Sequence, residues 1–305
     1  MPELPEVQTT VDGLNALVRG KKIVEVWTDY RSSFHATKEN IKNPRYFARF
    51  RNAVRGAKIL GAERRGKNVL IHLQRGHTIL IHMKMTGHLM VGTYVFSAKE
   101  KIWRPKISRG PLTDPFNRYI HLVFTLSNKK HLVFSDLRKF ATVYLFKTAD
   151  ASTLDDLSHL GPEPLAHDFT FQKMCERLAR RPQGKIKQVL MDQEIIAGIG
   201  NIYSDEMLWI AGIHPLARVG KIPPAVLKKL YAAMRDVLRK GIDFGGDSDS
   251  DYRNIYGKPG KFQSTHNAYR RTGKLCPRRG CPGIIRRLAL AGRGAHFCDT
   301  HQKLF

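Results

Sequence analysis

Acidic residues are scarce in this chain. Asp and Glu total 26 against 52 Lys and Arg, which gives a formal net charge of +26 at pH 7. That excess is larger than solubility requires and is typical of proteins that bind a polyanion, most often a nucleic acid. A basic RNA-associated protein has the same composition, so charge alone does not choose between DNA and RNA.

Long apolar runs and targeting patterns are also missing. No run of about 18 apolar residues is present, so we expect no membrane-spanning helix and no membrane partner. The N-terminal residues lack the basic-then-apolar pattern of a secretory signal. Hydrophobic residues still make up 42% of the chain, which is enough for a buried core and argues against wholesale disorder.

Cysteine is rare and clustered. The four cysteines are Cys175, Cys276, Cys281 and Cys298. The spacing Cys276-x4-Cys281-x16-Cys298-x2-His301 gives two close ligand pairs separated by a loop, which predicts one structural zinc ion. His296 and Cys175 remain alternatives to His301 as the fourth ligand. Because four protein ligands leave no open coordination position, we assign this zinc to folding and not to catalysis.

Hydrophobic periodicity predicts a β-rich first half. Apolar residues at positions 7, 11, 14 and 18 share one helical face, which predicts a helix over 5–18, opened by Pro5 and closed near Gly20. The period then changes to two. Strands are expected within 21–30, 57–74, 77–85, 119–126, 131–136 and 141–146. Residues 1–148 are therefore predicted to form a two-layer β-sandwich or flattened barrel with a leading helix.

The second half is predicted to be helical. An acidic, proline-containing stretch at 149–168 is typical of a linker. Helical periodicity returns in 169–181, 186–193, 201–212 and 223–241. We assign 169–262 to a helical domain that ends in a Gly-rich polar loop. The cysteine cluster occupies 263–305, with a short β-hairpin between its ligand pairs. The fold class is α+β.

Two short motifs have the chemistry of phosphate binding. Gly198 and Gly200 precede Asn201 at the start of a predicted helix, and such a turn exposes unpaired backbone N–H groups. Arg293 stands between two glycines in the predicted finger hairpin. Ordinary turn chemistry explains the first pattern equally well, and a solvated arginine explains the second.

Five motifs occur in one order along the chain. They are PELPEV, HMKMTG, SDLRKF, LMDQEIIAGIGNIYSDEMLW and GRGAHFC. This order resembles the formamidopyrimidine-DNA glycosylase / endonuclease VIII family of base-excision repair enzymes, and Leu4 favours the formamidopyrimidine branch. The resemblance implies a helix-two-turn-helix domain and a terminal zinc finger. It also implies a monomeric, bifunctional DNA glycosylase and AP lyase that removes oxidised purines, such as 8-oxoguanine and formamidopyrimidines, from duplex DNA. Such an enzyme is expected in the cytoplasm or nucleoid of a bacterium, or in the nucleus or an organelle of a eukaryote.

The resemblance gives the chain end a chemical task. After removal of Met1, Pro2 becomes the N-terminal secondary amine, and an α-amino group titrates near pH ~8, so a useful fraction is neutral and nucleophilic. In the family this amine attacks C1′ of the damaged nucleotide and forms an iminium ion that permits β- and δ-elimination. Glu3 matches the acid/base that moves protons at the sugar, and Glu6 matches a supporting acid. Favourable charge at a helix N-terminus is the structural alternative for both glutamates.

The same resemblance assigns the DNA contacts. The residues that match phosphate-binding positions are Lys67, His82, Asn201 and Arg293. Lys67 and Arg293 are expected to be catalytic, with Lys67, Asn201 and Arg293 clamping the phosphates that flank the extruded nucleotide. A flipped-out nucleotide leaves a gap in the duplex. The residues that match the family's gap-filling positions are Met85, Arg138 and Phe140. Core packing is the alternative for Met85, because apolar residues alternate along 79–85.

Two features depart from the family pattern. The first cysteine pair has four intervening residues where the family usually has two, and His301 replaces the last cysteine. The loop expected to contact the flipped base is acidic, with Asp247, Asp249 and Asp251, and Ser250 and Tyr252 are its candidate base contacts. A glycosylase that prefers oxidised pyrimidines, a non-catalytic binder of damaged DNA and an RNA-binding protein therefore remain alternatives.

Overall fold

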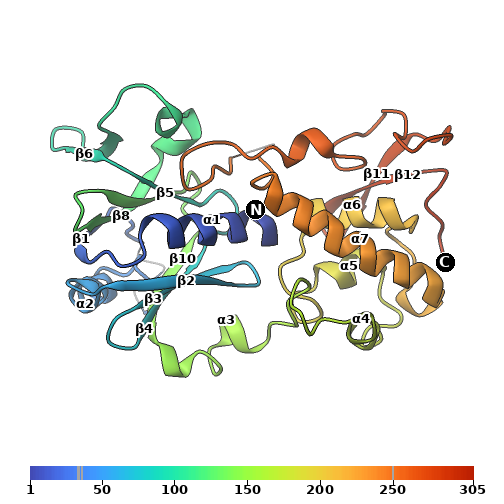
Figure 1. The fold of residues 1–305 in the computed structure, drawn as a ribbon, viewed down its shortest axis with the longest axis horizontal. Helices are drawn as coiled ribbons and strands as arrows, with labels where there is room; N and C mark the ends of the chain where they lie inside the picture. The colour runs from blue at the N-terminus through green and yellow to red at the C-terminus, as the bar shows by residue number, and fades with distance from the viewer. Residues whose placement is uncertain (33–34, 36, 249–250) are drawn as a thin grey trace. The chain divides into compact units, whose positions relative to one another are not determined.

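A computed structural model describes residues 1–32, 35, 37–248 and 251–305 (Figure 1). The chain forms two compact units. The first contains Met1–Ser158 and Phe244–Lys261, and the second contains His159–Asp243 and Phe262–Phe305. The Gly-rich segment that the sequence analysis assigned to the helical domain thus groups with the first unit. It does so because its side chains and backbone bond to the N-terminal helix and strands, as described below.

Two four-stranded antiparallel sheets form the first unit. One has the order β1-β8-β9-β5, from Ile23–Thr28, Ile120–Leu126, His131–Ser135 and His88–Gly92. The other has the order β10-β4-β3-β2, from Thr142–Lys147, His77–His82, Asn68–Leu73 and Ile59–Arg65. One core cluster contains side chains of both sheets, among them Val26 and Phe134 from the first and Ile71 and Ile81 from the second. The predicted two-layer β-sandwich is confirmed.

The predicted leading helix is α1, Leu4–Leu17, which contacts β2 and β3 (Figure 1). Its apolar face is buried, and Glu3 at the N-cap forms a capping box with Glu6, so the start of the chain is fixed by local bonds. A second helix, α2, Pro44–Val54, was not predicted. Asn43 caps it by accepting from the backbone of Arg45, and Tyr46, Phe50 and Val54 form its buried face.

The connection from β5 to β8 forms an additional outer layer of the first unit. It contains the hairpin of β6, Tyr94–Ser97, and β7, Ile102–Pro105, and the 3-10 turns η2, Pro111–Thr113, and η3, Pro115–Arg118. A small cluster beside the main core holds this layer, and it consists of Met90, Tyr94, Ile120, Val123 and Val133, with Trp27, Trp103 and Leu112 packed against it. The elements of this segment were not predicted from the sequence.

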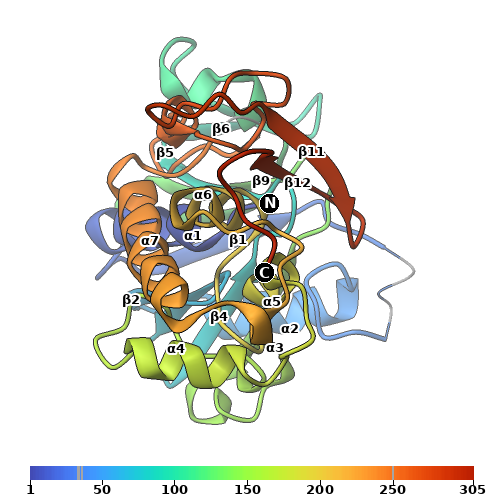
Figure 2. The same ribbon diagram turned by 90° about the vertical axis from the view of Figure 1, so that its right-hand side faces the viewer.

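The second unit is helical and ends in a β-hairpin. Its helices are α4, Phe171–Leu178, α5, Ile186–Met191, α6, Asn201–Ala211, and α7, Pro224–Asp243. Figure 2 faces this unit and shows the hairpin of β11, Ile285–Leu290, and β12, Arg293–Cys298, which pairs in register across a turn at Ala291 and Gly292. β12 contacts α6. The predicted α+β class, helices and terminal hairpin are confirmed. Within the described residues, no helix has the length and apolar character needed to cross a membrane.

Candidate active site and metal centre

The N-terminus is held by one buried carboxylate. Pro2, Glu3 and Glu6 are all buried in the described structure. The Oε2 atom of Glu6 accepts from the backbone N–H of Glu3 at 2.7 Å, and its Oε1 atom accepts from the N–H of Asp247 at 2.7 Å. Glu6 therefore fixes the chain end and the base of the acidic loop together, which is more than a favourable charge at a helix start.

The side of this loop that returns to the core is buried as well. Tyr252 is buried, burial raises the pKa of its phenol, and its O–H donates to the backbone oxygen of Glu6 at 3.0 Å. Tyr252 thus supports the loop from beneath α1. Asp249 and Ser250, the other residues considered in this loop, lie outside the described residues.

Lys67 and His82 are close neighbours. Lys67 lies in the tight turn between β2 and β3, not within a strand, and Asn68 beside it pairs with His82 across the sheet. Burial, with smaller effects from Lys84 and Lys67, lowers the pKa of His82 to about 3, so this ring is neutral at physiological pH. Its Nδ1 atom accepts from the N–H of Lys84 at 3.0 Å. The ring proton is therefore on Nε2, which can donate to an oxygen ligand.

Three residues matched to gap filling lie in two exposed turns of the first unit. Met85 is 43% exposed in the turn after β4, whereas Met83 is 1% exposed in the core. Phe140 is 50% exposed, and the guanidinium of Arg138 lies 4.5 Å from the centre of its ring. The side chains of Arg138 and Phe140 lie against each other because the backbone turns between them, with φ 54° at Lys139. An extended backbone had been expected here from the sequence.

A buried aspartate joins these two turns. Asp136 Oδ1 accepts from the hydroxyl of Thr86 at 2.5 Å, and its Oδ2 accepts from the N–H of Ala141 at 3.0 Å and from Tyr30 O–H at 3.1 Å. The Thr86 hydroxyl oxygen in turn accepts from the N–H of Arg138 at 3.1 Å. The backbones that carry Met85 and Phe140 are thus bonded through a single carboxylate.

In the second unit, Asn201 is the first residue of α6. Gly198 has φ 88°, and Gly200 is the N-cap and supplies no side chain to cap α6. No acidic residue stands in the first turn of this helix. The Oδ1 atom of Asn201 is buried and has no hydrogen-bond partner among the described residues. This helix start has the features of an anion site.

Arg293, exposed at the start of β12, is linked to Asn201 through a buried ion pair. Lys187 pairs with Asp205 of α6, and the ammonium also donates to the backbone oxygens of Asn201 and Gly294, each at 3.4 Å. The other oxygen of Asp205 accepts from the N–H of His296 at 3.0 Å. One ion pair thus ties the start of α6 to the start of β12.

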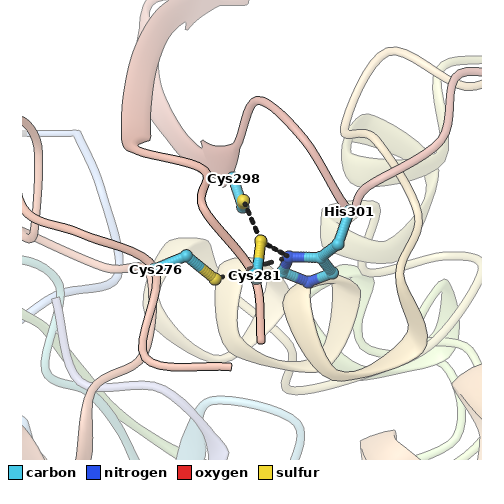
Figure 3. A group of neighbouring side chains, drawn as sticks. All are labelled: Cys276, Cys281, Cys298 and His301. Atoms are coloured by element: carbon cyan, nitrogen blue, oxygen red, sulfur yellow. Dashed lines mark hydrogen bonds between the residues drawn. The ribbon is translucent and has the colours of Figure 1, made fainter. Parts of the chain in front are cut away.

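The four predicted metal ligands converge (Figure 3). The ligand atoms of Cys276, Cys281, Cys298 and His301 all lie within 4.8 Å of one another. Cys281 Sγ is 3.6 Å from Cys298 Sγ, and Cys276 Sγ is 3.4 Å from His301 Nδ1. Tetrahedral zinc with Zn–S bonds near 2.3 Å places its ligand atoms about 3.8 Å apart. These residues therefore fit Zn²⁺.

His301 is oriented for this role by α6. Its Nε2–H donates to the backbone oxygen of Trp209 at 3.0 Å, which leaves Nδ1 deprotonated and directed at the sulfurs. The alternatives for the fourth position are engaged elsewhere. His296 bonds to Asp205 through Nδ1 at 2.9 Å, and Cys175 lies on α4, outside the cluster.

Two family models match the chain. One is the formamidopyrimidine-DNA glycosylase N-terminal domain, over residues 1–143, and the other is the formamidopyrimidine-DNA glycosylase H2TH domain, over residues 160–252. This chain belongs to the formamidopyrimidine-DNA glycosylase family. The resemblance inferred from the five sequence motifs is confirmed.

Individual members of the family are similar over their full length. The formamidopyrimidine-DNA glycosylase of Bacillus subtilis is 34% identical over 303 residues, 99% of each chain. That of Chloroflexus aurantiacus is 36% identical over 302 residues, 99% of this chain and 98% of the relative. A crystal structure of a Lactococcus lactis Fpg mutant with Fapy-dG-containing DNA has a TM-score of 0.80 at 30% identity, covering 97% of this chain and 98% of that one. A complex of Lactococcus lactis Fpg with abasic-site DNA has a TM-score of 0.80 at 29% identity, covering 97% of each chain.

The buried acids that position the site were not foreseen from the family motifs. Asp136 and Asp205 lie inside two of the quoted motifs, near residues that received roles, yet neither was singled out. Each motif contained the necessary signal, since an ionisable residue next to apolar positions must find partners when it is buried.

Proposed function

We propose that this chain is a bifunctional DNA glycosylase and AP lyase that excises oxidised purines from duplex DNA. The observation that carries the proposal is the buried N-terminus, where Pro2 and Glu3 are buried and Glu6 accepts from the backbone N–H of Glu3. A protein that only binds damaged DNA has no need of a fixed amino terminus. Full-length similarity to formamidopyrimidine-DNA glycosylases, including Fpg structures with Fapy-dG and abasic-site DNA, supports the same reading.

The reaction begins at the Pro2 amine once Met1 has been removed. The neutral amine attacks C1′ of the damaged nucleotide, the bond from C1′ to the base breaks, and the base leaves with that electron pair and a proton. Opening of the sugar ring gives an iminium ion between the proline nitrogen and C1′. Glu3 supplies a proton during ring opening.

Strand cleavage follows because the iminium ion accepts electrons. Loss of a proton from C2′ expels the 3′ phosphate by β-elimination, and a second proton loss expels the 5′ phosphate by δ-elimination. Hydrolysis of the remaining imine regenerates the amine. We propose that Glu6 acts through position alone, by holding the Glu3 backbone.

DNA binding uses cationic and hydrogen-bonding side chains from both units. We propose that Lys67 and His82 in the first unit, and Asn201 and Arg293 in the second, each contact backbone phosphates. A neutral His82 that donates from Nε2, and the side-chain amide of Asn201 at the positive end of the α6 dipole, suit phosphate oxygens. The net charge of +26 supplies long-range attraction to the polyanion.

The exposed turns of the first unit fill the gap left by the flipped nucleotide. Met85 and Phe140 present apolar side chains that can occupy the space between base pairs, and Arg138 has donors for the orphaned base. The stacking of Arg138 on Phe140 presents the two side chains as one unit.

Zinc is proposed as the structural cofactor of the terminal finger. Its four ligands are Cys276, Cys281, Cys298 and His301, and a closed ligand set supplies folding energy but no open position for a reactant. In this arrangement the finger holds β11 and β12, and therefore Arg293, in a fixed position. We also propose the remaining predicted domain limits, with the finger beginning near residue 263.

The decisive experiment traps the covalent intermediate. Borohydride reduction during incubation with an 8-oxoguanine duplex is expected to give a protein–DNA adduct that is lost in Pro2→Gly. Mass spectrometry of the wild type confirms that Met1 has been removed. Glu3→Gln, with its amine intact, is the matched variant and is expected to lose base excision. Absence of an adduct on every oxidised-purine, oxidised-pyrimidine and abasic duplex would overturn the proposal. The same panel decides between purine and pyrimidine lesions.

A further inference from the structure

The segment Gly110–Arg118 holds the residues that follow the acidic loop. Arg253 is 7% exposed, and its Nε atom donates to Asp114 Oδ2 at 3.0 Å. Its guanidinium lies 4.7 Å from the centre of the Phe116 ring and donates from Nη1 to the backbone oxygen of Tyr252 at 2.8 Å. An ion pair, a ring and a backbone bond thus fix Arg253 and, through it, Tyr252.

Asn117 in the same segment makes a second attachment. It is buried, and its Nδ2 atom donates to the backbone oxygens of Pro111 at 2.8 Å and of Gly257 at 3.1 Å. Its Oδ1 atom accepts from Nε2 of the buried His88 at 2.9 Å. Gly257 has φ +78°, and a Cβ there would lie 2.9 Å from Asn117 Nδ2, so only glycine permits this approach.

The turn between these two attachments is anchored in the core. Ile255 is 1% exposed and belongs to the main hydrophobic cluster. Its backbone oxygen accepts from the N–H of Val91 at 2.9 Å, and its side chain packs where Gly13 of α1 leaves no room for a Cβ. The returning arm of the acidic loop is therefore rigid from Tyr252 to Gly257.

Asp247 and Tyr252, on the two sides of the acidic loop, are both bonded to α1. Asp247 N–H and the Tyr252 hydroxyl bond to Glu6, through its carboxylate and its backbone oxygen, respectively. The same carboxylate holds the N–H of Glu3. A displacement of Tyr252 therefore moves the loop relative to the proposed nucleophile, whose target carbon carries the damaged base.

We propose that Gly110–Arg118 is the positioning element of the base-recognition loop, with Asp114 and Asn117 as positioning residues. The inference rests on the proposed function. Excision of a base requires the loop to hold that base over Pro2. Cleavage at a preformed abasic site has no base to hold and needs only the amine and Glu3. Loss of the attachment therefore separates the two activities.

The test uses Asp114→Asn in the full-length chain, which removes the charge facing Arg253 at nearly constant volume. Glu100→Gln is the matched control, because it breaks an exposed ion pair with Arg104 in the same outer layer and does not contact the loop. Excision of 8-oxoguanine is measured as kcat and KM, and strand cleavage is measured on an abasic duplex. Since small misplacements of a reacting group cost up to about 100-fold in rate, we expect kcat for excision to fall roughly 10- to 100-fold in Asp114→Asn. Abasic cleavage and Glu100→Gln should match wild type, and Asp114→Glu should recover part of the loss.

Equal loss of excision and abasic cleavage, or no loss of either, overturns the inference. If Asp114→Asn does not fold, Phe116→Leu serves instead, because it removes the ring over Arg253 and keeps the carboxylate of Asp114. The same selective loss is then required. If the wild type cleaves abasic DNA and the positioning variants excise 8-oxoguanine as fast as the wild type does, only the positioning role is refuted. A wild-type chain that traps on no duplex refutes the proposed function.

Discussion

Replacement of Lys187 by methionine tests whether one buried ion pair organises the second unit. Lys187 and Asp205 are 1% and 0% exposed, respectively. The pair is bonded to Asn201 and Gly294 on the lysine side and to His296 on the aspartate side. Methionine keeps most of the apolar stem and removes the ammonium, so Asp205 becomes a buried charge without its cation.

The expected effect on stability is large. Removal of one partner of a buried ion pair costs roughly 3–5 kcal/mol, because the remaining charge is left uncompensated. For a domain of this size, that loss lowers the midpoint of thermal unfolding by roughly 6–20 °C. Affinity for a duplex with an abasic-site analogue should also fall, by about tenfold for each 1.4 kcal/mol lost from the proposed phosphate contacts of Asn201 and Arg293.

Two further variants serve as controls for this prediction. Lys187→Met/Asp205→Asn removes both charges and is expected to recover a large part of the lost stability, since no charge is then left buried alone. Lys228→Met removes an exposed lysine of α7 and should change the midpoint by no more than about 2 °C. Circular dichroism and fluorescence anisotropy measure the two effects. If Lys187→Met unfolds at the temperature of Lys228→Met, the ion pair does not stabilise this unit as argued.

Three other predictions concern separate parts of the molecule. Metal analysis should find zinc in the wild type and in His301→Cys but not in Cys298→Ala, whose thermal midpoint should also fall. A metal-free native protein would contradict the finger assignment. Asp136→Asn should slow excision from duplex DNA by about tenfold and leave cleavage of single-stranded abasic DNA unchanged, because only a duplex has a gap to fill; equal loss on both substrates would exclude a gap-filling role. Burial lowers the pKa of His88 from 6.5 to about 4, so the unfolded chain binds a proton that the folded chain does not as pH falls below 6.5. The contribution of neutral His88 to the free energy of unfolding is present above pH 6.5 and is lost between pH 6.5 and 4. About 2 kcal/mol of this contribution is lost by pH 5. Urea unfolding at pH 7 and pH 5 should show a smaller difference for His88→Gln, and an unchanged difference would contradict the assignment.

Elements with a clear hydrophobic period were predicted from the sequence. α1, the hairpin of β3 and β4, and α7 each repeat apolar residues at the spacing of their own geometry, so local sequence carries the signal. α2 was missed although Tyr46, Phe50 and Val54 recur at four-residue spacing, because apolar residues such as Phe47 also stand between them and weaken the contrast between the two helix faces. The outer layer of β6 and β7 was missed because short strands in a polar segment have little periodicity of their own.

The chemistry of the site was also readable in the sequence, through short ordered motifs. The family motif at the chain end predicted Pro2 as the nucleophile and Glu3 as the acid/base. The spacing of Cys276, Cys281, Cys298 and His301 predicted a metal centre. The structure brings the four metal ligands together, as predicted. It also decides between His301 and His296 as the fourth ligand, since only a fold can show which ring faces the sulfurs.

What only the tertiary structure decided is how these reactive residues are held. Glu6 bonds to Asp247, Asp136 bonds to Thr86, and Asp205 bonds to His296, across large separations in the chain. A buried carboxylate must satisfy both oxygens, and the partners that do so are whichever donors the fold brings within about 3 Å. These partners cannot be predicted from composition or hydrophobic periodicity. The sequence by itself therefore determined the family and the secondary structure of the periodic segments, and it predicted the reacting groups. The packing of the folded chain determined the positions of these residues.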